Sequence, residues 1–203
     1  MNTLEKVQRQ IRSMKLRFML GSGDLSADRA AQIADTVTGW ARSDLAAGAR
    51  KDLVLFSFES SFEEISDEIA KLADRGEAEA YRDIYEKIYE FACETMEDAY
   101  MPLYLFILYR YANALLMTGE TGKAVRCFEK LLEGTERLIG IENSYGIHCL
   151  ERLAAAAAAD GQREKANRAL EKMRRIAAEE FGEESAMSLA VGRLSRRLRQ
   201  AGT

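Results

Sequence analysis

Apolar and polar residues follow one another along this chain at helical spacing, and one arrangement of them recurs. The stretches MTGETGKAVRCFEKLL (117–132) and AADGQREKANRALEKM (158–173) each hold a glycine, a few polar residues, an alanine and a large apolar residue four positions later. The matched pairs share a single spacing of forty-two positions and are Gly119 and Gly161, Ala124 and Ala166, Phe128 and Leu170, and Leu131 and Met173. The chain therefore contains an internal repeat.

Two further glycines extend this repeat, because Gly76, Gly119, Gly161 and Gly202 follow one another at intervals of forty-three, forty-two and forty-one positions. One stripe lies eleven and four residues before each glycine: Ile65, Leu108, Leu150 and Val191, then Leu72, Leu115, Ala157 and Leu198. A second stripe follows the first three glycines: Tyr81, Tyr85 and Ile88, then Ala124, Phe128 and Leu131, then Ala166, Leu170 and Met173. This pattern predicts repeats of two antiparallel helices that stack and share a core.

This pattern resembles the tetratricopeptide repeat family, in particular its 42-residue variety found in kinesin light chains. The residues that carry the resemblance are Tyr111, Ala112, Leu115, Gly119, Ala124 and Phe128 in one copy and Leu153, Ala154, Gly161, Ala166 and Leu170 in the next, together with Gly140 and Gly182 in the loops. The copy at Gly76 departs from it at Tyr81 and Glu68. The resemblance implies an all-α fold, a right-handed superhelix of antiparallel helix pairs over residues 61–203, in which the last, arginine-rich helix is a cap.

Residues 1–60 do not show the repeat clearly and are expected to pack on it as additional helices. Residues 3–20 predict a helix with an apolar stripe, Leu4, Val7, Ile11, Met14 and Phe18, and Asp24 or Ser26 can cap the next helix, which should run through Trp40 to about Ala47. After Gly48, KDLVLFSFESS is either helix or buried connector, and Ser61 with Glu64 is typical of a capping box that opens the first repeat helix.

The helix at residues 3–20 is basic, with Lys6, Arg9, Arg12, Lys15 and Arg17 against Glu5. A role at a membrane surface or on nucleic acid is conceivable for such a helix. The favoured interpretation is that its apolar stripe packs on the domain and that its charge complements the acidic neighbour at residues 59–98.

Composition supports the helical interpretation and narrows the class of protein. The 203 residues are 47% hydrophobic and 31% charged, with one proline. Residues 52–100 carry 15 acidic and only 4 basic side chains, which argues against nucleic-acid binding by the body of the domain. Three dispersed cysteines and a single histidine fit neither a disulfide framework nor a zinc site, so a reducing, cytoplasmic location is expected. No apolar run is long enough to span a membrane, and the first residues lack a signal-peptide core.

The sequence offers little support for catalysis, and no cofactor or metal is expected. His148 and Cys149 are adjacent, but neighbours on a helix point about 100° apart and do not face each other. The carboxylate pairs Glu64 with Glu68 and Asp83 with Glu86 have no histidine beside them and are typical of a solvated face. No phosphate-binding loop or nucleophile-elbow motif occurs.

The resemblance to the tetratricopeptide family also implies a ligand groove lined by the first helix of each repeat. The implied partner-binding residues are Phe106, Tyr109 and Asn113 in one copy, His148 and Glu151 in the next, and Arg196 in the last. Ser66 and Ala70 stand where the carboxylate-clamp subgroup needs lysine and asparagine, so binding of a chaperone tail is not inferred. The sequence thus predicts a non-catalytic scaffold that binds a protein or peptide segment. Alternatives are a regulatory module that senses a peptide and a structural protein that self-associates as a homodimer.

Overall fold

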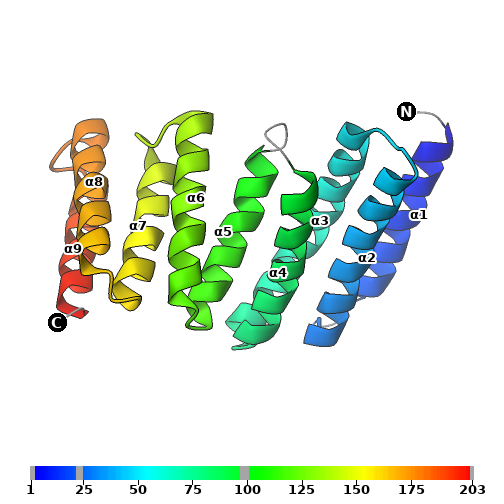
Figure 1. Cartoon of the computed structure of the whole chain (residues 1–203), viewed down its shortest axis with the longest axis horizontal. Coiled ribbons are helices and arrows are strands. Elements are labelled where there is room, and N and C mark those ends of the chain that lie inside the picture. The colour runs from blue at the N-terminus through cyan, green and yellow to red at the C-terminus, as the bar shows by residue number, and fades with distance from the viewer. Residues whose placement is uncertain (1–2, 22–24, 97–100, 202–203) are drawn as a thin grey trace. The chain divides into compact units, whose positions relative to one another are not determined.

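The computed structural model describes residues 3–21, 25–96 and 101–201, and every regular element in these ranges is a helix (Figure 1). The nine helices of the described residues are α1 (Thr3–Leu20), α2 (Ala27–Ala46), α3 (Lys51–Asp74), α4 (Ala78–Thr95), α5 (Met101–Met117), α6 (Thr121–Ile139), α7 (Ser144–Ala159), α8 (Arg163–Phe181) and α9 (Ala186–Ala201). The predicted all-α class is confirmed, whereas the right-handed superhelix remains a prediction. No helix within the described ranges combines the length and apolar character that crossing a bilayer requires.

The chain divides into two compact units, Met1–Tyr104 (unit 1) and Leu105–Thr203 (unit 2). Unit 1 contains α1 to α4 and the start of α5, and unit 2 contains the rest of α5 and α6 to α9. Within unit 1, α2 packs against both α3 and α4, and α1 packs against α2 and α3. Within unit 2, α7 packs against α6, α8 and α9. The predicted division into N-terminal helices (1–60) and repeats (61–203) remains a prediction.

The repeat glycines lie where the sequence places them, between the two helices of each pair. Gly76, Gly119 and Gly161 have φ angles of +80°, +80° and +76°, a left-handed backbone that favours glycine, because its lack of a Cβ removes the steric penalty. In each of these turns the chain reverses direction between consecutive helices (Figure 1). The fourth predicted turn, at Gly202, lies outside the described residues.

The apolar stripes that define the repeat form the core, except at Leu198, which is half-buried. The stripe before the glycines is buried at Ile65, Leu108, Leu150 and Val191, and the stripe after them is buried at every predicted position from Tyr81 to Met173. Tyr81, which occupies the place of an alanine, packs its ring against Tyr85 with centroids 4.8 Å apart. Tyr81 is thus buried in the core and contacts a ring one turn along the same helix, α4.

The predicted start of the first repeat helix at Ser61 is wrong. Helix α3 begins ten residues earlier, at Lys51, and KDLVLFSFESS forms its first half. Ser61 donates its hydroxyl hydrogen to the carbonyl oxygen of Ser57 (3.1 Å), a bond made inside a helix and not at its end. The apolar face continues without a break because Val54, Leu55 and Phe58 precede Phe62 and Ile65 at spacings of three and four residues.

The predicted packing of α1 through its apolar stripe is also wrong. The side chains of Ile11, Met14 and Phe18 are exposed, and α1 is held by its opposite face, where Leu16 is fully buried. Arg12 on that face forms an ion pair with Asp44 of α2, with Nη2 and Oδ1 2.8 Å apart. Arg12 and Lys15 also lie over the ring of Trp40, at 5.5 and 5.6 Å from its centroid. These partners come from α2, so no pattern inside α1 could reveal them.

Helix ends follow the local sequence in both units. Ser26, one of the two predicted caps, accepts a hydrogen bond from the backbone N–H of Arg29 (3.4 Å) and begins α2, whereas Asp24 lies outside the described residues. In unit 2, Asn143 and Ser185 begin α7 and α9 by accepting hydrogen bonds from the N–H groups of Gly146 and Ser188 (2.9 and 3.1 Å).

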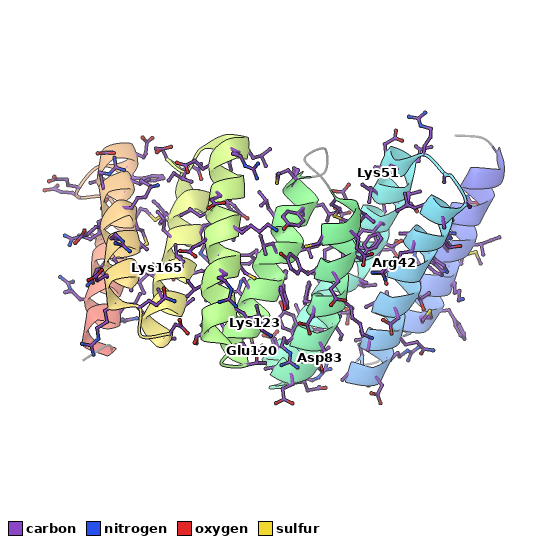
Figure 2. All side chains as sticks on the ribbon, in the orientation of Figure 1. Arg42, Lys51, Asp83, Glu120, Lys123 and Lys165 are labelled. Atoms are coloured by element: carbon purple, nitrogen blue, oxygen red, sulfur yellow. The ribbon has the colours of Figure 1, made fainter. Side chains whose placement is uncertain are left out.

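Ion pairs join side chains of different helices and side chains at the start of one helix. Lys165 of α8, labelled in Figure 2, forms an ion pair with Glu129 of α6 (Nζ to Oε1 2.6 Å). Figure 2 also labels Glu120 and Lys123, whose side chains pair at 2.6 Å where α6 begins. In unit 1, Arg42 of α2 pairs with Glu94 of α4 at 3.0 Å. Such exposed pairs contribute about 0–1 kcal/mol each to folding, so the buried stripes dominate stability.

Candidate functional site

Unit 2 brings three of the six predicted partner-binding residues together. The hydroxyl of Tyr109 on α5 and Nε2 of His148 on α7 are 2.8 Å apart and share a hydrogen bond. On the other side of the imidazole, Nδ1 of His148 lies 3.4 Å from Oε2 of Glu151. The side chains of His148 and Glu151 are 41% and 37% exposed, so this row of polar groups lies at the surface. It links the first helices of two successive repeats.

The position of His148 depends on how α7 begins. Asn143 caps the helix, and Gly146 lies in its first turn against the backbone of Ile141. A Cβ atom on Gly146 would come within 2.1 Å of the Ile141 carbonyl oxygen, so only glycine permits this close turn. Ile141 and Ile147 are buried, which fixes the rotation of α7 and turns His148 toward α5.

Tyr145 and Cys149 of α7 lie beside this row. Tyr145 is 37% exposed, although part of its side chain is desolvated by its neighbours. Burial raises the pKa of Tyr145 to about 12, with smaller contributions from Cys149 and Tyr109. Burial also raises the pKa of the Cys149 thiol to about 11, although hydrogen bonds with Thr135 and Tyr145 act in the opposite direction. Cys149 is fully buried. It is a neutral thiol near neutral pH, and the structure gives His148 a tyrosine and a glutamate as partners.

The other three predicted residues occupy separate positions. Asn113 on α5 donates from Nδ2 to the carbonyl oxygen of Tyr109 (2.7 Å), four residues earlier in the same helix. Phe106 is 37% exposed, and the guanidinium of Arg110 lies 5.1 Å from the centre of its ring. Arg196 is exposed on α9, and no hydrogen bond or ion pair among the described residues joins it to Tyr109 or His148.

Sequence reasoning missed two arginines of this surface, Arg110 and Arg152. In each of them Nε is buried without a hydrogen-bond partner in the described chain. Both stand nine residues before a turn glycine and are therefore one repeat length apart, and Arg193 occupies the same place before Gly202. The repeat spacing could have found them, because Asn113, Tyr109 and Phe106 stand six, ten and thirteen residues before Gly119. The position nine before the glycine lies on the same side of the helix.

These arginines make the surface of the first helices positive. Arg110, Arg152, Arg193 and Arg196 form no ion pair with another described residue, and Glu151 is the acidic neighbour within the His148 row. We define the α5–α7 surface as Phe106, Tyr109, Arg110, Asn113, Tyr145, His148, Glu151 and Arg152. It offers aromatic rings, hydrogen-bonding tips and guanidinium groups, which suit a chain with carboxylates and a polar backbone.

Two other features of the described residues offer little chemistry. No cluster of three or more histidine, cysteine or acidic side chains in these ranges is placed to hold a metal ion. A shallow hollow of about 520 Å³ lies between α8 and α9 and is lined by Glu171, Arg174, Arg175, Ala178, Glu183, Ser188 and Gly192. Its charges of both signs are balanced, so it selects no particular ligand class.

No family model matches this sequence, and no curated protein matches it. The likeness to tetratricopeptide repeats therefore rests on the residues of the repeat itself.

Proposed function

We propose that this protein is a non-catalytic binding module whose α5–α7 surface holds a peptide or helical segment of a partner. The observation that carries the proposal is the row formed by Tyr109, His148 and Glu151, because it joins two successive repeats with polar groups at the surface. A ligand lying across α5 and α7 would meet this row at its centre.

The residue types in the surface suit recognition of an extended or helical chain. Tyr109 and Tyr145 present an apolar ring with a polar tip, and such side chains contribute strongly to interfaces at a low cost in side-chain entropy. Phe106 and its stacked Arg110 add an apolar contact with a positive edge. His148 and Glu151 can exchange their mutual contact for hydrogen bonds to a ligand backbone.

The charge of the surface supports a ligand with acidic side chains. Arg110 and Arg152 have their Nε atoms buried, which holds each guanidinium against its helix and leaves a pre-oriented fork for a carboxylate. Pre-orientation lowers the entropy lost on binding. An acidic peptide or an acidic helix face is therefore the ligand class that this surface supports best.

Selection from a random peptide library tests this proposal without a known partner. The full chain serves as bait, and a variant with Tyr109→Ala and His148→Ala serves for counter-selection. Peptides that depend on the α5–α7 surface should carry an excess of Asp and Glu, and their Kd should rise about thirtyfold or more in the double variant, as expected for hot-spot residues.

Arg168→Ala provides the matched control, because Arg168 is exposed on α8 and stands outside the α5–α7 surface. It should leave the Kd of the selected peptides unchanged. Circular dichroism shows whether the double variant is folded. If the selected peptides bind the folded double variant as tightly as the original chain, the α5–α7 surface is not the binding site.

A further inference from the structure

Helix α1 presents an apolar face that the rest of the described chain does not cover. Ile11, Met14 and Phe18 are 59%, 72% and 83% exposed, and they lie on one side of the helix at spacings of three and four residues. Leu4 and Val7 continue the same spacing in the sequence. Large apolar side chains aligned in this way and exposed together mark an interaction surface.

The opposite face of α1 is fixed to the body of unit 1. Leu16 is fully buried, Arg12 is paired with Asp44, and Trp40 lies beneath Arg12 and Lys15. These contacts hold α1 in place while its apolar stripe points away from α2 and α3. The stripe is therefore displayed by an anchored helix, and exposing it does not require α1 to detach.

The charges beside the stripe are positive. Lys15 and Arg17 are exposed, and at about 100° per residue Lys15 falls on one side of the stripe and Arg17 on the other. Over residues 3–20 the sequence holds five basic residues and one acidic residue. Two copies of α1 placed face to face would bring like charges together, whereas an anionic surface would attract both flanks.

We propose that α1 docks this protein on an anionic lipid bilayer, lying in the plane of the interface. Ile11, Met14 and Phe18 enter the boundary between headgroups and acyl chains, and Arg17 reaches the lipid phosphates beside them. Lys15 stays over the ring of Trp40 and adds its positive charge to the other flank of the stripe. A helix with a narrow apolar stripe, basic flanks and low overall hydrophobicity binds in this way. Basic side chains near such a surface add electrostatic attraction that salt weakens. This docking is independent of ligand binding at the α5–α7 surface.

Co-sedimentation of the full chain with lipid vesicles tests the proposal. The chain should bind phosphatidylcholine vesicles that contain phosphatidylserine more tightly than pure phosphatidylcholine vesicles, and added salt should weaken the binding. Replacing Met14 and Phe18 together by serine should weaken it by about tenfold or more, since both side chains lose their burial in the lipid. Arg17→Glu should weaken binding to the anionic vesicles while changing binding to the neutral ones little.

Phe56→Ser is the matched control. Phe56 is 49% exposed on α3, in a region of the sequence where acidic side chains dominate, and its loss should leave lipid binding unchanged. Trp40 is the single tryptophan of the chain, so an unchanged emission spectrum of each variant shows that α1 is still docked on α2.

Three results would overturn the proposal. One is no binding to either kind of vesicle, and another is equal loss of binding in Phe56→Ser. The third is a dimer in sedimentation equilibrium without lipid that dissociates when Met14 and Phe18 are replaced, because the stripe would then be covered by a second copy.

Discussion

At the scale of single residues, two neighbours on α7 lie in opposite surroundings. His148 faces the surface and shares a hydrogen bond with Tyr109, while Cys149 points into the core beside Thr135. Burial raises the pKa of Cys149 to about 11, so the thiol is not a nucleophile near neutral pH. The adjacency of histidine and cysteine in the sequence therefore leads to two separate roles, one at the surface and one in packing.

The cysteines should differ in their reactivity with a thiol reagent. At pH 8 a thiol with a pKa near 11 is ionised in about one molecule in a thousand, and burial reduces its access further. Cys93 is exposed and should react with Ellman's reagent at once, whereas Cys149 should react only after unfolding. The variant with Cys93→Ser and Cys127→Ser isolates Cys149, and rapid reaction of this folded variant would contradict the burial described here.

Asp160 predicts a defined pH dependence of stability. Its carboxylate accepts hydrogen bonds from Oγ1 of Thr121 (2.6 Å) and from Nε2 of Gln162 (2.7 Å), and these bonds lower its pKa below 3.8. Because the folded-state pKa is depressed, the stabilisation is present above about pH 4 and is lost as the pH falls through the folded-state value. Urea unfolding should find Asp160→Asn less stable than the original chain at pH 6, and the difference should shrink as the pH falls through the depressed folded-state pKa of Asp160.

Thr121→Val supplies the control for this experiment, because it removes the first of the two donors. In the Thr121→Val background, Asp160→Asn should lower the free energy of unfolding by less than it does alone. Equal effects in the two backgrounds would show that Thr121 does not stabilise the ionised carboxylate.

At the scale of the helices, the repeat sets the pairs and the turns, but it does not set how every helix packs. The stripes around Gly76, Gly119 and Gly161 were predictable, because each burial pattern repeats with the turn. The packing of helix α1 was not predictable, because its apolar stripe and its buried Leu16 lie on opposite faces. Which face packs on the domain depends on Asp44 and Trp40 of α2. The prediction of a helix start at Ser61 failed for a different reason, because a serine followed three residues later by glutamate also occurs inside helices.

The contacts within the α5–α7 surface were also only partly predictable from the sequence. The resemblance to tetratricopeptide repeats implied that Tyr109 and His148 lie on the ligand-facing side of their helices. Their hydrogen bond depends on the packing between α5 and α7, which the spacing of residues within one helix does not contain. The arginines Arg110 and Arg152 followed the repeat and could have been found by extending the alignment to one more position.

The start of α7 gives a prediction on stability. Gly146→Ala places a Cβ against the backbone of Ile141, where nothing flexible can move aside, so it should destabilise the protein by about 1–3 kcal/mol. Gly192→Ala is the matched control, because no atom lies within 4 Å of the added Cβ in α9. It should stabilise by about 0.5–1 kcal/mol, since alanine is the better helix former. Thermal unfolding measures the change in stability in each variant. Equal changes in Gly146→Ala and Gly192→Ala would contradict the close turn at Ile141.

At the scale of the whole molecule, the two units carry charges of opposite sign. Unit 1 holds 13 basic and 20 acidic residues, and unit 2 holds 16 and 13. The arginines of the α5–α7 surface belong to the positive unit, so its own field favours the approach of an acidic ligand. The net charge of −4 hides this local excess, because the acidic residues of unit 1 outweigh the basic excess of unit 2.

The binding rate of an acidic peptide should therefore depend on ionic strength. Because the Debye length shortens to about 10 Å at 0.1 M salt, the association rate measured by stopped flow should fall as salt rises. Arg110→Gln with Arg152→Gln should lower the low-salt rate and flatten this dependence. A salt dependence of the same slope in this variant would show that the arginines do not attract the ligand.

The loops before α7 and after α8 have a consequence for how such a chain can grow. Gly140 ends α6 and Asn143 caps α7, and one repeat length later Gly182 ends α8 and Ser185 caps α9. The segment 144–185 thus begins and ends at equivalent joints. A tandem duplication of the gene segment that encodes it would join each new copy to the last through a loop of the same length with the same kind of cap. The chain could therefore gain a helix pair, and with it another copy of the first-helix surface, in a single genetic event that requires no new turn.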